Sequence, residues 1–276
     1  MLSLNKHGLS HVWEWMLRVG NPYVSHWLFP GWLTLAAYVL VCLYFTYKDV
    51  MRHESKIQKD WWPSLGDMAR AAVPQLAVYT GLNGLFTYLY PIYLELPQEA
   101  PSLLGFFLEV ATSFVVGDFL IYAEHRVMHA VPFLRNSIHS VHHAYHAPFG
   151  WAGGWVHPLE DAVVVACQVA FPLSYGVHPL SLWAFTFVWV LLLIEEHSGH
   201  DVFWAPYNWM PFARWPTGGG GAPHDIHHYR PTKNFGFVLI IWDQLFGTYT
   251  PVLEPPVKPA NYAQWWEWQP VSQKEK

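Results

Sequence analysis

The sequence predicts an all-α protein that crosses a membrane several times, with about four transmembrane helices and a cytosolic helical cap. Three observations support this fold class. Hydrophobic residues make up 53% of the 276 residues and charged residues 13%, which is about half the share usual in soluble proteins. Aromatic residues reach 18%, as expected for belts at two membrane interfaces. The apolar residues also form long runs, most of them close to the ~20 residues that a spanning helix needs.

Four apolar regions give the predicted helices. The first is Trp32–Tyr47, the second runs from about Met68 to Leu94, and the third is Leu103–Tyr122. The fourth, Ala162–Ile194, is interrupted by glycine and proline at Tyr175–Pro179. Because such residues mark turns, the fourth region is predicted to form two shorter helices joined as a hairpin.

The charges of the loops predict the orientation of the chain. The loop 48–60 carries four basic residues, whereas Glu95–Pro101 carries two glutamates and no basic residue. Cytoplasmic loops are enriched in lysine and arginine, so 48–60 is predicted to be cytosolic and Glu95–Pro101 to lie across the membrane. The later helices then deliver residues 123–160 and 195–276 to the cytosolic side.

Three short histidine clusters lie just beyond the predicted helix ends. They are HRVMH (His125, His129), HSVHH (His139, His142, His143) and HDIHH (His224, His227, His228). With 17 histidines in the chain, one HxxxH arises by chance about once, but two HxxHH arise together in only about a few such chains per thousand. Positions three and four apart share a helix face, so each cluster is expected to aim two or three imidazoles at one point. Imidazole is the commonest metal ligand in proteins, and the clusters therefore predict a metal site.

The number of imidazoles predicts two metal ions. A structural zinc ion takes four nitrogen or sulfur ligands, usually with cysteine, and neither Cys42 nor Cys167 lies near a cluster. Eight nitrogen donors suit two ions with room for a further ligand, and iron, copper, zinc and nickel all accept such donors. Carboxylates usually orient metal-bound imidazoles, and Glu124, Glu196 and Asp225 are the expected partners.

With these clusters the sequence resembles the membrane-bound sterol desaturase and fatty acid hydroxylase superfamily, whose signature is HxxxH, HxxHH and a C-terminal HxxHH. HHAYHAPFG followed by HPLE resembles C-4 methylsterol monooxygenases. EEHSGHD is similar to an element of those enzymes and of cholesterol 25-hydroxylases, and HDIHHYRPTKNFGF with WDQLFGT resembles the superfamily's ending. We therefore expect an N-terminal membrane region at 1–100, a fatty acid hydroxylase-type catalytic domain at 101–250 and a tail at 251–276.

The resemblance implies a di-iron monooxygenase that oxidises a lipid C–H bond with O2. The cofactor would be two iron ions, which zinc can replace in a purified sample, and the lipid would come from the bilayer. No haem, flavin or nicotinamide motif is found in the sequence, so a cytochrome b5-type donor and its NAD(P)H-dependent reductase are implied as partners. The implied location is the endoplasmic reticulum membrane with the site facing the cytosol, or the inner membrane of a bacterium.

The same motifs narrow the substrate. HAPFG, HPLE and HSG favour a sterol and oxidation of a C-4 methyl group in sterol biosynthesis. Side-chain (25-)hydroxylation of a sterol, hydroxylation of a fatty acid or another lipid, and desaturation remain as alternatives. Large apolar side chains between the clusters either line the path of the lipid or anchor the chain at the interface. They are Phe149, Trp151, Trp155, Trp204 and Trp209.

Three more histidines are candidates for the site. His197, in the HSG element, is expected to be a ninth ligand by resemblance. His200 stands where the sterol enzymes have tyrosine, so a ligand, a contact to a polar substrate group and a residue supporting a ligand all remain open. His157, in HPLE, is either a ligand or a core histidine bonded to a backbone carbonyl.

A metal transporter and a non-catalytic scaffold are the alternatives to an enzyme. A metal transporter binds its ion within the bilayer, on the transport path, whereas these clusters lie beyond the helix ends. A non-catalytic scaffold has no need of the chemistry, yet all eight histidines of the three clusters are intact. The formal charge of −5 argues against a nucleic-acid partner, which normally requires a basic face.

Overall fold

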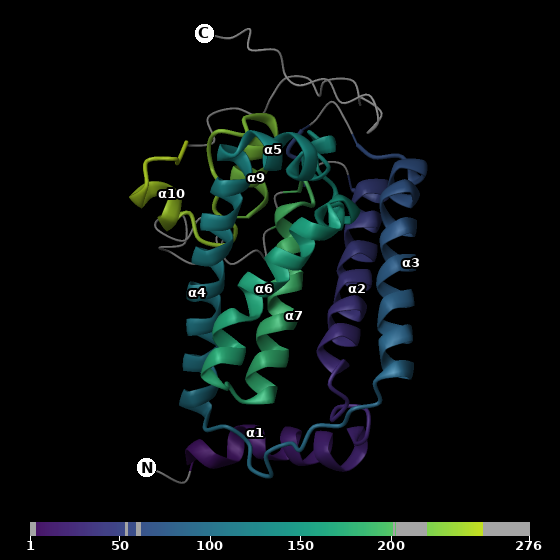
Figure 1. Ribbon diagram of the computed structural model, residues 1–276, viewed down its shortest axis with the longest axis vertical. Helices are drawn as coiled ribbons and strands as arrows, with labels where there is room; N and C mark the ends of the chain where they lie inside the picture. Colours follow the sequence, from purple (N-terminus) through teal and green to yellow (C-terminus); the bar gives the residue numbers. More distant parts are fainter. Residues whose placement is uncertain (1–3, 53–54, 59–61, 201, 203–219, 251–276) are drawn as a thin grey trace, which may run out of the picture.

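The computed structural model describes residues 4–52, 55–58, 62–200, 202 and 220–250, and this part of the chain is mainly helical (Figure 1). Its long helices lie lengthwise along the molecule in Figure 1. They are α2 (Phe29–Met51), α3 (Leu65–Leu89), α4 (Leu103–Ala130), α6 (Pro158–Tyr175) and α7 (Pro179–Glu196). Helix α1 (Leu4–Trp15) crosses their lower ends and continues into a π-helical turn, η1 (Met16–Gly20).

Helices α2, α4 and α7 are the ones among the described residues that are long and apolar enough to cross a membrane. Helix α3 has Asp67 and Arg70 near its start, and α6 has Glu160 and Asp161 in its first turn. Such charges reduce the tendency of a helix to cross the bilayer. The protein is an integral membrane protein, but the predicted count of four spans is not confirmed by length and hydropathy.

The predicted break within the fourth apolar region is confirmed. Helix α6 ends at Gly176, whose φ of 68° is in the left-handed region that glycine adopts without steric cost. The amide of Gly176 donates to the carbonyl of Pro172, and α7 then starts with Pro179 at its first position. Helices α6 and α7 pack against α4. Gly117 of α4 leaves room for the α7 side chain Trp189, because a Cβ at this position would lie 3.3 Å from that ring.

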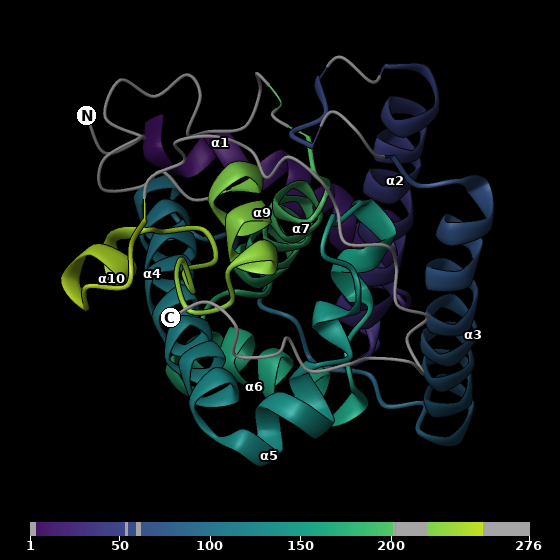
Figure 2. The same cartoon turned by 90° about the horizontal axis from the view of Figure 1, so that it is seen from above.

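Short elements gather at the upper ends of the long helices (Figures 1 and 2). They are α5 (Pro132–Leu134), η3 (Arg135–His139), η4 (His142–Ala144), η5 (Gly150–Gly154), α9 (Gly221–Tyr229) and α10 (Ile241–Leu245). In the view from above, α9 lies over the end of α7, and these two elements pack together. The histidine clusters lie on these elements and on the adjoining ends of α4 and α7.

The main hydrophobic core lies below these elements, between α2, α3 and α7. Phe149 and Trp151 are buried in this core and Trp155 packs against it, so they support the structure and do not line a path for a lipid. The other two aromatic candidates, Trp204 and Trp209, lie outside the described residues, as does the predicted tail 251–276.

Candidate metal centre

Nine histidine side chains form two adjoining groups at the upper ends of α4 and α7. Within each group the potential ligand atoms lie within 4.8 Å of one another. The five-histidine group comprises His125, His129, His139, His143 and His227, and the four-histidine group comprises His142, His197, His224 and His228. The two groups are neighbours, since the ring centroids of His143 and His228 are 4.7 Å apart. The structure thus brings together all nine histidines expected from the three clusters and the HSG element.

The Nε2 atoms in the five-histidine group are closely spaced. The Nε2 of His139 lies 2.8 Å from that of His129 and 3.1 Å from that of His125. The Nε2 of His227 lies 3.2 Å from those of His129 and His143. Each neutral imidazole has one N–H donor and one acceptor nitrogen. So many closely spaced ring nitrogens therefore indicate a common partner for them.

The four-histidine group has the same spacing. The Nε2 of His197 lies 3.2 Å from that of His142 and 2.9 Å from that of His224, which is in turn 3.1 Å from that of His228. For nitrogen ligands ~2.1 Å from an ion, adjacent ligands are ~3.0 Å apart in an octahedron and ~3.4 Å apart in a tetrahedron. The donor set and its spacing therefore fit two nitrogen-ligated ions.

Helical spacing explains how three clusters make two groups. His125 and His129 lie one turn apart on α4 and both join the five-histidine group. In HDIHH, His224 and His228 share one face of α9 and join the four-histidine group, while His227 joins the other. HSVHH divides in the same way, because His139 and His143 join the five-histidine group and His142 joins the four-histidine group. Each HxxHH motif therefore aims two imidazoles into one group, as expected, and its third imidazole into the other group, because i and i+4 positions share a face that i+3 only partly shares.

Backbone carbonyls fix the orientation of three rings. The Nδ1–H of His125 donates to the carbonyl of Phe235 at 3.0 Å, and that of His227 to Lys233 at 2.7 Å. His197 donates in the same way to Leu193 at 2.8 Å. A donating Nδ1 leaves the lone pair of Nε2 free and pointed into the group, which is the tautomer that a metal ion requires.

Carboxylates lie beside two further rings, and the pair of His139 with Glu160 has hydrogen-bond geometry. The Nδ1 of His139 lies 2.5 Å from Oε1 of Glu160, and the Nδ1 of His224 lies 3.2 Å from Oε1 of Glu196. Glu196 was an expected partner, whereas Glu160 was one of several other carboxylates near the clusters in the sequence. Glu160 is the third residue of α6, which His157 caps.

The other two expected carboxylates do not contact a histidine ring of the groups. Asp225 accepts from the Nε2 of Gln58, with both carboxylate oxygens at 3.0 Å. Burial raises the pKa of Asp225 to about 7. Glu124 lines the cavity described below, and its buried Oε1 has no hydrogen-bond partner among the described residues.

The segment that follows α9 holds the carbonyls that orient His125 and His227. The carboxylate of Asp243 accepts from the backbone amides of Phe235 and Gly236 at 2.8 and 2.6 Å. Asn234, with a left-handed φ of 54°, donates to the carbonyls of Pro223 and Thr250. Asn234 and Asp243 thus influence the site by fixing the backbone segment whose carbonyls orient His125 and His227.

Burial keeps the imidazoles uncharged. Desolvation lowers the pKa of His197 to about 4. It lowers the pKa values of His139, His142, His143, His224, His227 and His228 well below their usual range, and the neighbouring rings lower them further. Since only a neutral imidazole offers a lone pair to a cation, the environment favours the ligand form of these side chains.

His157 and His200 lie outside both groups. The Nδ1 of His157 accepts from the amide of Leu159 at 3.2 Å and so caps α6. His200 is fully buried, with Nε2 3.0 Å from Oδ1 of Asp49 and Nδ1 2.8 Å from the hydroxyl of Ser55. The same Asp49 oxygen forms a buried ion pair with Lys56 at 2.7 Å. His200 thus belongs to a polar network behind the loop that follows His197.

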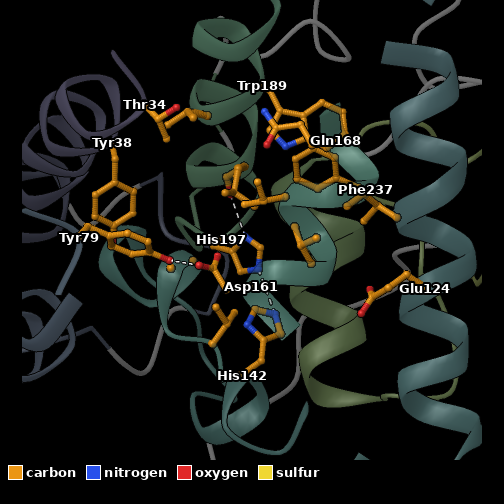
Figure 3. Close-up of a pocket in the computed structure, with 18 of the residues that line it drawn as sticks. Thr34, Tyr38, Tyr79, Glu124, His142, Asp161, Gln168, Trp189, His197 and Phe237 are labelled. Carbon is orange, nitrogen blue, oxygen red and sulfur yellow. Dashed lines mark hydrogen bonds between the residues drawn. The ribbon is translucent and has the colours of Figure 1, made fainter. Parts of the chain in front are cut away.

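A largely apolar cavity of about 190 Å3 runs from the histidines into the helical part of the molecule (Figure 3). His142, His197 and His224 line it, together with His125 of the other group. Its walls come from α2, α3, α6 and α7, with side chains such as those of Leu35, Val164, Trp189, Leu193 and Phe237. The four-histidine group therefore faces a space suited to an apolar molecule.

Sequence comparison gives the relationship of this centre to known proteins. Residues 110–248 match the fatty acid hydroxylase family. The chain belongs to this family. The match covers all nine histidines of the two groups and the segment that orients His125 and His227, so the resemblance to the sterol desaturase and fatty acid hydroxylase superfamily is confirmed.

Individual relatives of this fatty acid hydroxylase family member fall into two kinds. It is 30% identical to cholesterol 25-hydroxylase of Mus musculus over 257 residues, which cover 87% of this chain and 82% of the relative. It is 28% identical to cholesterol 25-hydroxylase-like protein 2 of Danio rerio, with 92% of each chain covered. Very-long-chain aldehyde decarbonylase GL1-8 of Oryza sativa subsp. indica is 37% identical over 143 residues, about half of each chain. No solved structure matches this chain.

Proposed function

We propose that this protein is an O2-dependent membrane hydroxylase that holds two iron ions, one in each histidine group, and oxidises a C–H bond of a sterol. The observation that carries this proposal is the position of the two groups. Nine imidazoles form two groups of potential metal ligands, and three members of the four-histidine group line an apolar cavity within an integral membrane protein. A membrane lipid entering that cavity would meet the metal site directly.

The side chains of this protein hold, orient and shield the centre. When bound, the pair of iron ions would supply the activation of dioxygen that hydroxylation of an unactivated carbon requires and that no side chain can supply. The carbonyls of Leu193, Lys233 and Phe235 and the carboxylate of Glu160 keep four imidazoles in one orientation. The apolar cavity wall excludes water and holds the lipid beside the four-histidine group.

The partners and location follow from the same proposal. Electrons would come from a cytochrome b5-type donor and its NAD(P)H-dependent reductase, because the family match and the sequence motifs supply no redox cofactor other than a metal site. The basic loop 48–60 supports a cytosolic position for the centre, since Lys56 of this loop donates to the carbonyl of Ser198, next to His197. We propose the endoplasmic reticulum membrane, or the inner membrane of a bacterium, as its location.

Two positions on a sterol are candidates for oxidation. The HAPFG, HPLE and HSG elements favour a C-4 methyl group, whereas the similarity over most of the chain to proteins named cholesterol 25-hydroxylase favours the side chain. Dihydrolanosterol offers both positions in one molecule. The full-length protein, purified in detergent and loaded with ferrous iron, should convert it to an oxygenated product when given O2 and reductant, and mass spectrometry locates the new oxygen.

Metal content and products distinguish the hydroxylase from a desaturase, a scaffold and a metal transporter. Two tightly held ions per chain and a product that incorporates ¹⁸O from ¹⁸O₂ are expected of the hydroxylase. Loss of hydrogen without added oxygen would indicate a desaturase. A scaffold would convert no lipid and hold no metal, and a transporter would carry its ion across vesicles without altering a lipid.

A further inference from the structure

One polar pair on the wall of the cavity has no part in holding the histidines. Tyr79 of α3 and Asp161 of α6 both line the cavity, and the Tyr79 hydroxyl donates to the Oδ2 of Asp161 (Figure 3). Among the described residues, this tyrosine is the one side chain that hydrogen-bonds Asp161. Both residues line the same cavity as His142 and His197.

A carboxylate can accept about four hydrogen bonds, and Asp161 is partly buried on the cavity wall. A few polar groups on an otherwise apolar wall are the groups that orient a ligand in such a cavity. No described basic side chain pairs with Asp161, so its remaining hydrogen-bonding capacity is available to a molecule in the cavity.

The chain places this pair at the histidine end of the cavity. Asp161 directly follows Glu160, whose carboxylate contacts the Nδ1 of His139. A group bound to Asp161 in the cavity shares that space with His142 and His197, which line it too (Figure 3). On α3, Tyr79 is one turn from Gln75. The Gln75 side chain accepts from the Tyr38 hydroxyl and donates to the carbonyl of Trp151.

We propose that Tyr79 and Asp161 bind the hydroxyl group of the sterol substrate; this rests on the proposed hydroxylase function. The substrate hydroxyl donates to the Asp161 carboxyl group, which Tyr79 holds in place. An alcohol fits this pair, whereas a free fatty acid would bring a second carboxylate against Asp161. Because the pair lies near the histidines, the oxidised carbon lies near the hydroxyl, and C-4 of a sterol is the carbon next to the one that carries it. The pair therefore selects a C-4 methyl group over the distant side chain.

Binding measurements test the pair without depending on turnover. The iron-loaded full-length protein is titrated with cholesterol and with cholest-5-ene, which lacks the hydroxyl. The wild type should bind cholesterol about 10- to 100-fold more tightly, as expected for a hydrogen bond to a carboxyl group. In Asp161→Leu this preference should fall to less than about threefold, and Asp161→Asn, which keeps a polar group of the same size, should retain part of it.

Val165→Leu is the matched control. It adds similar bulk to the same wall of α6, so it should weaken both lipids equally and keep their ratio. Iron content of all variants verifies that the site still forms. An unchanged ratio in Asp161→Leu, or a wild type that does not distinguish the two lipids, would overturn the proposal.

Turnover of dihydrolanosterol separates this inference from the proposed function. Oxygen added to a C-4 methyl group supports the placement of the hydroxyl, and oxygen added to the side chain overturns it while leaving the hydroxylase intact. If the wild type oxidises no sterol but still prefers cholesterol through Asp161, the proposed function fails and the hydroxyl-binding pair stands.

Discussion

The two histidine groups differ in the number of their donors and in what they face. The five-histidine group contributes one side chain, His125, to the wall of the cavity, whereas the four-histidine group contributes three of its four members. The group with fewer nitrogen donors is therefore the one that faces the cavity. Catalytic metal sites generally have fewer protein ligands than structural ones, which leaves room for an external ligand. Under the proposed function, the five-histidine group would mainly hold its ion, and the four-histidine group would be the one placed to meet O2 and substrate.

The two groups are also supported from different parts of the chain. Glu160 and the carbonyls of Lys233 and Phe235 support the five-histidine group, so its rings depend on α6 and on the segment after α9. The four-histidine group depends on α7, through the carbonyl of Leu193 and the carboxylate of Glu196. Variants can therefore perturb one group while leaving the other in place.

Removal of a ligand should have the largest effect and should be selective for one ion. We expect His224→Ala to lower sterol oxidation at least ~100-fold, because loss of even a partner of a metal ligand costs 10- to 100-fold. His129→Ala should do the same through the other group. Mass spectrometry of the metal content should show about one ion lost in each variant.

His157→Ala is the control for ligand removal, because His157 caps α6 and lies outside both groups. It should keep two ions per chain. Loss of both ions in His157→Ala, or of neither ion in His224→Ala, would contradict the assignment of the groups.

The next largest effect is expected in the polar network behind the four-histidine group. Asp49 and Lys56 are both 2% exposed, and Lys56 also donates to the carbonyl of Ser198, next to His197. Asp49→Leu leaves a buried ammonium group without its carboxylate, which should lower the free energy of unfolding by about 3–5 kcal/mol. Chemical denaturation in detergent measures this, and the double variant Asp49→Leu/Lys56→Met should recover much of the loss.

Loss of a supporting carboxylate should have an intermediate effect. Glu160→Gln weakens the hydrogen bond to His139 and should reduce the affinity of the five-histidine group for iron about 10- to 100-fold. Glu196→Gln should act on the other group through His224. Competition with a chelator measures the two affinities separately. Equal loss at both positions in both variants would show that the groups are not independently supported.

The smallest expected effect comes from one methyl group. A Cβ at Gly153 would lie 3.0 Å from the Cβ of His197, so Gly153→Ala must shift that ring slightly. The strain should be about 1 kcal/mol, the lower end for overpacking, and should weaken iron binding in the four-histidine group only. Gly84→Ala, which meets no atom within 4 Å, is the matched control and should leave both affinities unchanged.

The sequence predicted the helices and the histidines of the site better than it predicted their support. Apolar runs and helix-breaking residues located the long helices, because burial and backbone geometry act over neighbouring residues. The spacing of HDIHH predicted side chains that the structure gathers into the two groups, but its division between them depends on how α9 packs on α7. The supporting carbonyls of Leu193 and Lys233 left no signal in the sequence, since every residue has a carbonyl and only the fold decides which one is used.

Helix α9 contributes donors to both groups, with His227 in one and His224 and His228 in the other. A growing polypeptide that ends before residue 224 therefore lacks part of each set, although α4 and α7 have already been made. During translation at ~5–20 residues per second, the apolar helices enter the bilayer well before either set of donors is complete. Neither group can therefore be complete until α9 has been made, and a product truncated before residue 224 would lack donors of both groups.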